Sequence, residues 1–161
     1  MKRVILFICI ALQLSGCAHV VSKEMRDRAE SGISPDLFFR NPDAFTGRVI
    51  ILGGFIARTM TGEGGSSYIE VVQNPLDSSG RPADRDVSSG RFLIFSEGRI
   101  DSTIYSAGRE VTVAGEVLGK KIMPINGTEY AYPVIKSEEL HLIRERRRIP
   151  VHLGIGIWKR F

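Results

Sequence analysis

A series of short β-type segments, separated by glycines and polar turns, is the feature that most limits the fold of this chain. The segments are rich in valine, isoleucine and aromatic residues, and they begin after Gly47. No segment shows the long helical periodicity of a bundle, so we expect strands to build the core. The expected strands cover residues 48–58, 67–73, 91–95, 110–118 and 132–143.

Glycines mark corners and ends of these strands. Gly53 and Gly54 interrupt the first segment, and paired glycines inside a strand predict the bulge or sharp bend that small barrels need at their corners. Residues 110–118 alternate valines with polar residues, as a strand with one wet face requires, and Gly119 ends the pattern. About five such strands favour a mainly β fold, a small antiparallel OB-like β-barrel, over a sandwich.

Short helical turns are expected before the first strand. Ser34-Pro35-Asp36 and Asn41-Pro42-Asp43 both place a side-chain oxygen before a proline, which is typical of a helix start. Residues 61–66 contain three glycines and predict a hairpin turn. The stretch 74–89 is rich in proline, serine and aspartate, so we expect a long surface loop.

The N-terminal residues have the order of a bacterial export signal. Two basic residues precede an apolar run from Val4 to Leu12, which is too short to span a bilayer. Leu14-Ser15-Gly16-Cys17 follows and resembles a lipobox. We expect cleavage between Gly16 and Cys17 and lipidation of the Cys17 thiol. A plain secretory signal with an incidental cysteine is the alternative.

Cysteine usage excludes a disulfide-stapled fold. The second cysteine, Cys9, lies in the part that cleavage removes, so Cys17 has no thiol partner within the mature chain. Zinc sites built on cysteine pairs are excluded for the same reason. The chain that remains after cleavage is long enough to form one domain with a hydrophobic core.

We therefore divide the chain into four parts. A signal peptide (1–16) precedes a lipidated N-terminus and flexible tether (17–34), an OB-like β domain (35–143) and a basic C-terminal tail or extra strand (144–161). The tether is polar and charged, with little apolar surface to offset the entropy of ordering. A short amphipathic helix is the alternative for this segment.

Basic residues gather at the C-terminal end, although the formal net charge of the chain is only +4. Clustered charges of one sign act together on a charged surface. This end is a candidate contact for anionic lipid, lipopolysaccharide or an envelope protein, with a solvated charge run as the alternative. The candidate residues are Arg144, Arg146, Arg147, Arg148, Trp158, Lys159 and Arg160.

The sequence contains no catalytic motif and no metal-ligand spacing. It lacks the G-x-S-x-G, H-E-x-x-H and P-loop patterns, and its three histidines, His19, His141 and His152, are scattered. We predict a protein that is not an enzyme and that needs no cofactor. The alternative function is a periplasmic ligand-binding or protein-interaction module that uses the open face of the barrel. Four tyrosines motivate it: Tyr68, Tyr105, Tyr130 and Tyr132.

Motifs along the middle of the chain occur in a characteristic order. They are Asn74-Pro75-Leu76-Asp77 with Gly80-Arg81-Pro82, then Ser89-Gly90-Arg91, and the block from Gly108 to Gly115. Together with the lipobox they resemble the Slp family of starvation-inducible outer-membrane lipoproteins, over roughly Pro35 to Ile143. The resemblance implies an outer-membrane lipoprotein associated with starvation and envelope stress, and it offers no catalytic residues.

The residue after the lipidated cysteine favours the outer membrane. In enteric bacteria an aspartate at this position retains a lipoprotein at the inner membrane, and here the residue is Ala18. We expect a lipid-anchored protein at the periplasmic face of the outer membrane, with a structural or envelope-stress role. Its location disfavours a nucleic-acid partner.

Overall fold

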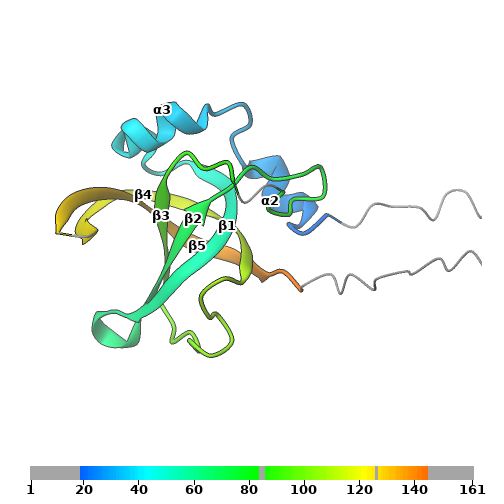
Figure 1. Cartoon of the computed structure of the whole chain (residues 1–161). Coiled ribbons are helices and arrows are strands. Elements are labelled where there is room, and N and C mark those ends of the chain that lie inside the picture. The colour runs from blue at the N-terminus through cyan, green and yellow to red at the C-terminus, as the bar shows by residue number, and fades with distance from the viewer. Residues whose placement is uncertain (1–18, 84–85, 126, 145–161) are drawn as a thin grey trace, which may run out of the picture.

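The computed structural model describes residues 19–83, 86–125 and 127–144, which form a closed five-stranded barrel with helices ahead of the first strand (Figure 1). The strands are β1 (Val49–Thr61), β2 (Ser67–Gln73), β3 (Arg91–Ser96), β4 (Glu110–Ile125) and β5 (Thr128–Leu142). The helical elements are α2 (Lys23–Arg28), α3 (Pro35–Arg40) and the 3-10 turns η1 (Pro42–Phe45) and η2 (Glu63–Gly65).

The strand order around the barrel is β1-β2-β3-β5-β4, and β4 pairs with β1 to close it. This order confirms the predicted OB-like barrel. Neighbouring strands are antiparallel except for β3 and β5, which run parallel where Leu93 pairs with Val134. The hairpin predicted at 61–66 holds η2 between β1 and β2.

The paired glycines of β1 lie where its pairing changes from β4 to β2, and Gly54 faces Val111 on one side and Gln73 on the other. The register shift that marks a bulge in β1 falls beyond them, between Ile56 and Arg58. A Cβ on Gly54 would lie 1.9 Å from the carbonyl oxygen of Val72. Only glycine allows the three strands to approach this closely.

The β4–β5 hairpin is longer than the sequence predicts. We expected the fourth strand to end at Gly119, but β4 continues to Ile125 and β5 begins at Thr128. Gly119 has φ +97°, and the register shifts between Val117 and Gly119. The glycine therefore forms a bulge inside the ladder rather than an end.

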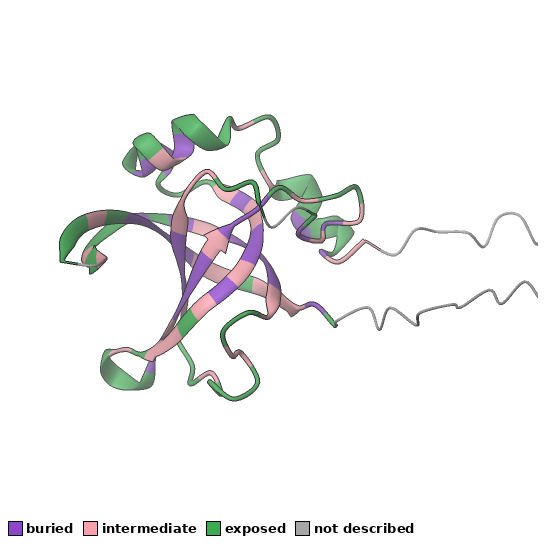
Figure 2. Cartoon of the chain, viewed as in Figure 1, coloured by how far each residue is buried: buried purple, intermediate pink, exposed green. Residues whose placement is uncertain are grey.

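The main core fills the barrel and includes Phe38 of α3 and Phe45 of η1, and Figure 2 shows buried residues along the barrel strands and on α3. Phe38 of α3 and Phe45 of η1 pack edge to face, with ring centroids 5.5 Å apart. Pro35 and Pro42 begin α3 and η1, as the sequence predicts, although the Ser34 side chain makes no capping hydrogen bond. The barrel residues of this core are Ile50, Ile56, Ile69, Val71, Phe92, Ile94, Val111, Val113, Val117 and Ile135.

The segment predicted as a flexible tether contains a helix that packs on the barrel. Val21 is fully buried and Met25 of α2 is 4% exposed, and both belong to one buried cluster with Ala114 of β4. The structure therefore has the short amphipathic helix that the sequence left as the alternative. Its apolar face has too few residues to stand out in so polar a segment.

Candidate functional site

The structure describes one of the residues that the sequence marks as sites. Arg144 follows β5 and is exposed. The roles predicted for the others, in cleavage, lipidation and membrane or partner contact, stay predictions. These residues lie outside the described part of the chain: Gly16, Cys17, Arg146, Arg147, Arg148, Trp158, Lys159 and Arg160.

The end of β5 lies against the N-terminal segment, so both ends of the described chain are on one side of the barrel (Figure 1). The Ser22 amide donates to Glu139 Oε2 at 3.0 Å, and Arg28 pairs with Glu138 at 2.7 Å. Hydrogen bonds from the Ser22 side chain, from His141 and from the Ser22 backbone lower the pKa of Glu139 to about 2. This carboxylate therefore helps to fix the start of α2 to the barrel.

Of the four tyrosines that motivate the binding-module alternative, three lie together on the outside of the barrel. Tyr132 is fully buried there, and the Tyr130 ring packs edge-on against it with centroids 4.7 Å apart. Tyr68 joins the same group, whereas Tyr105 packs against the main core. We call this group the outer-face cluster. Its members are Met60, Tyr68, Leu93, Phe95, Met123, Ile125, Tyr130, Tyr132 and Val134.

A groove of about 730 Å³ runs along the margin of the outer-face cluster, between the β1–β2 turn and β4. The rings of Tyr68 and Phe95 lie 5.2 Å apart, and Lys121 Nζ lies 4.2 Å from the centre of the Tyr68 ring. The wall of the groove also includes Met60, Glu63 and Met123. This outer-face groove combines aromatic surface with one exposed cation, which suits an extended ligand.

A buried carboxylate lies beside the groove and holds two arginines. Glu70 follows Tyr68 by two residues on the outward side of β2, yet its side chain is only 3% exposed. Arg58 Nε donates to Glu70 Oε2 at 2.6 Å, and Arg91 Nη1 donates to Oε1 at 2.6 Å. The Tyr132 hydroxyl donates to Oε1 at 3.2 Å. We call these four residues the Glu70 cluster.

The protonation states of the cluster follow from these contacts. Burial alone raises the pKa of Glu70, but hydrogen bonds from Arg91 and Arg58 outweigh it and lower the pKa below its ordinary value. Burial, with the nearby Glu70 charge, raises the pKa of Tyr132. At neutral pH the carboxylate is ionised and the phenol is protonated. Sequence reasoning missed this cluster, whose one local signal is an acid at an outward-facing position between Tyr68 and Val72.

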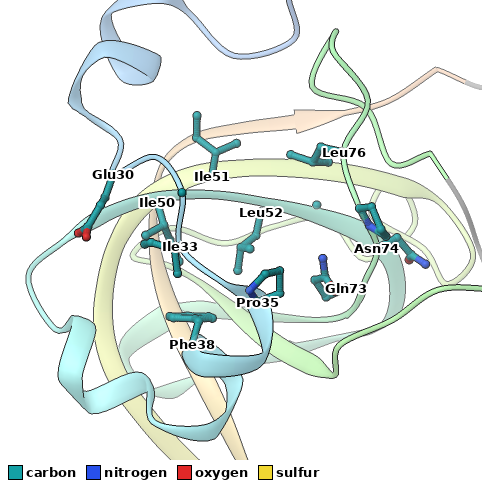
Figure 3. A pocket seen from close by; sticks show the side chains of 13 residues that line it. Glu30, Ile33, Pro35, Phe38, Ile50, Ile51, Leu52, Gln73, Asn74 and Leu76 are labelled. Carbon is teal, nitrogen blue, oxygen red and sulfur yellow. The ribbon is translucent and has the colours of Figure 1, made fainter.

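A second hollow of about 360 Å³ lies beneath α3 (Figure 3). Apolar side chains from the segment before α3, from β1 and from the loop after β2 surround it, with the Gln73 and Asn74 amides at one edge. Glu30, the charged residue of the described lining, pairs with Arg48 at 2.7 Å. Its apolar wall includes Ile33, Pro35, Phe38, Leu52 and Leu76.

The described residues 19–83, 86–125 and 127–144 contain no group of three or more metal-ligating side chains. His19 bonds to the Val21 backbone, and His141 Nε2 lies 3.0 Å from Glu139. His152 lies outside the described residues. Over the same part of the chain, no helix has the length and apolar character needed to cross a membrane.

Comparison with known sequences identifies relatives. The family model described as outer membrane lipoprotein Slp family matches residues 14–155. An uncharacterized lipoprotein of Escherichia coli K12, YeaY, is 30% identical over 132 residues, which cover 78% of this chain and 64% of YeaY. An uncharacterized protein of Haemophilus influenzae is 29% identical over 96 residues, 59% of this chain and 51% of the relative. The chain thus spans about half to two thirds of the length of these relatives.

Similar solved structures include two single-stranded DNA-binding proteins. The small protein from Streptomyces coelicolor is 13% identical with a TM-score of 0.40, covering 60% of this chain and 94% of that chain. Mitochondrial Rim1 from S. cerevisiae is 13% identical with a TM-score of 0.38, covering 64% of this chain and 99% of that chain. Both likenesses are remote.

Proposed function

Because this chain belongs to the Slp family of outer membrane lipoproteins, we propose that lipid on Cys17 anchors it to the periplasmic face of the outer membrane. Its role there is non-enzymatic, in envelope structure or stress tolerance. The observation that carries the proposal is that the matched residues 14–155 include Leu14-Ser15-Gly16-Cys17. Each buried methylene contributes about 0.8 kcal/mol, so more than one acyl chain makes a lasting anchor.

The docked N-terminal segment supports a barrel held close to the membrane. The Val20 amide donates to the Ser79 carbonyl at 2.8 Å, and Val21 is fully buried. Only Ala18 separates Cys17 from His19, where the described chain begins, and two residue steps of extended chain span roughly 7 Å. The β1–β2 and β4–β5 hairpin tips lie on the opposite side from both described ends (Figure 1). The hairpins would then point into the periplasm.

The anchor is tested with Cys17→Ala in the full chain, and Cys9→Ala is the matched control. Cys17→Ala should abolish palmitate labelling and leave uncleaved precursor, whereas Cys9→Ala should be labelled and fractionate with the outer membrane like the wild type. Continued labelling of Cys17→Ala would contradict the proposal.

The basic tail is proposed to contact anionic lipid on the same membrane. Arg144 is exposed and follows β5 on the side where the described N-terminal end lies (Figure 1). A chain truncated after Ile143 should keep its anchor but give fewer crosslinks to phosphate-bearing lipid. Equal crosslinking by the full and truncated chains would remove the tail from consideration.

The outer-face groove favours a second candidate function, as a periplasmic binding module for an extended chain. The specific observation is the Tyr68–Phe95 ring pair with Lys121 over Tyr68. A photo-crosslinking residue at position 68 should give saturable crosslinks in cells, and one at Tyr105 should not. Lys121→Ala should weaken crosslinking from position 68. Equal products from both positions would contradict a specific groove.

A further inference from the structure

The Glu70 cluster carries more positive charge than its carboxylate neutralises. Two guanidiniums face one buried Glu70, which leaves an excess of one positive charge. The arginines are not buried with it, because the side chains of Arg58 and Arg91 are 51% and 39% exposed. The excess charge is therefore accessible to solvent.

The two arginines also retain most of their hydrogen-bond donors. A guanidinium has five N–H groups, and the contacts to Glu70 are made by Arg58 Nε and Arg91 Nη1. Both side chains line a shallow hollow of about 240 Å³ whose wall also includes Pro124, Ile125 and Tyr132. Donors held beside an apolar wall interact with an anion more strongly than donors in open water.

We propose that Arg58 and Arg91 form a binding site for a phosphate group, with Glu70 holding both side chains in place. Planar guanidiniums bind phosphate oxygens through paired, charge-assisted hydrogen bonds. Side chains that are already ordered lose less entropy on binding. The exposed Lys121, which pairs with Tyr132 across β4 and β5, adds positive charge nearby. This site depends on the barrel alone and goes beyond the proposed lipid anchor.

The test is calorimetry on the purified lipidated protein in uncharged detergent micelles at constant ionic strength. One titration uses inorganic phosphate, and a second uses micelles with or without phosphatidic acid. Arg58→Gln and Arg91→Gln should each weaken binding about tenfold, because each removes charge-assisted hydrogen bonds. Arg48→Gln is the matched control, since it removes an equally exposed arginine that is paired with Glu30. Its affinity should equal that of the wild type.

Glu70→Gln separates binding from stability. This variant keeps the side-chain volume and both arginines while it removes the opposing charge. Without the carboxylate the two arginines are no longer held together, so phosphate affinity should fall a few-fold at a temperature where thermal melting shows the barrel still folded. A purely structural cluster would lose stability with no change in phosphate binding by the folded protein.

The outcomes decide between the site and a structural ion pair. Saturable binding of inorganic phosphate supports a soluble phosphate ligand. Binding only to phosphatidic acid micelles supports a lipid headgroup where Arg58→Gln and Arg91→Gln weaken it, because the basic tail is unchanged in these variants. The proposal is overturned if the wild type binds neither probe. It is also overturned if Arg48→Gln loses as much affinity as Arg58→Gln, or if a folded Glu70→Gln binds phosphate as tightly as the wild type.

Discussion

Replacing Gly54 by alanine should strongly destabilise the barrel, because β1 has no room for a side chain where it passes between β2 and β4. A Cβ would lie 1.9 Å from the Val72 carbonyl oxygen and 2.8 Å from its carbonyl carbon. Close C···O contacts across strands are about 3.3 Å, so β1 and β2 would have to part by roughly 1 Å or more. Overpacking costs about 1–3 kcal/mol, and weakened ladder hydrogen bonds add about 0.5–1.5 kcal/mol each. We expect a total of about 3 kcal/mol or more.

Thermal unfolding followed by circular dichroism measures this loss. For a domain of this size about 1 kcal/mol lowers Tm by roughly 4 °C, so Gly54→Ala should melt about 10 °C or more below the wild type. Gly98→Ala is the control, because a Cβ there would meet no atom within 4 Å. Its change should stay below about 0.5 kcal/mol. If Gly54→Ala melts at the same temperature as Gly98→Ala, the close packing of Gly54 against Val72 is refuted.

Three further predictions concern the elements around the barrel. Phe38→Ala should lower the free energy of unfolding, measured in urea, by about 3–5 kcal/mol, because Phe38 is only 1% exposed. Leu37→Ala should lower it little, because Leu37 is 58% exposed. Met25→Ala should release α2 from the barrel without unfolding the barrel. Faster proteolysis near α2 with an unchanged Tm of the barrel would support this prediction, and a lower Tm would contradict it. The pKa of Glu139 is lowered from 4.5 to about 2, so its contact with Ser22 is fully present above about pH 4.5 and is lost as the pH falls toward 2. The protection factor of the Ser22 amide, which compares its exchange rate with the intrinsic rate at the same pH, should fall over this range in the wild type, and Glu139→Gln should remove that fall.

Local signals in the sequence were enough to predict the barrel. The five β-type segments follow from residue type, and all five are strands in the structure, although β4 and β5 are longer than predicted and residues 111–115 of β4 are buried on both faces. The Gly53-Gly54 pair is a local signal for a close approach of another strand, and Val72 of β2 makes that approach at Gly54. The lipobox at Cys17 is also a local signal, and its chemistry stays a prediction.

The features that sequence reasoning missed depend on contacts between distant residues. Gly119 resembles a strand end until pairing with β5 shows that it forms a bulge. Val21 and Met25 of the N-terminal segment are buried in a cluster with Ala114 of β4, which is distant from them in the sequence. Glu70, Arg58 and Arg91 lie on three strands, and only the register of the sheet brings them together. None of these contacts has a pattern within one short stretch of sequence.

The outer face of the barrel explains why the Glu70 cluster is better understood as a site than as a source of stability. The extended β4–β5 hairpin buries Leu93, Tyr132 and Val134 on this face, so an apolar side chain at position 70 would suit its surroundings. Replacing a buried ion pair by apolar residues of similar volume is often neutral or stabilising. The fold therefore does not need a carboxylate here. A carboxylate does, however, hold Arg58 and Arg91 together at an exposed hollow, where two guanidiniums would otherwise repel each other and move freely.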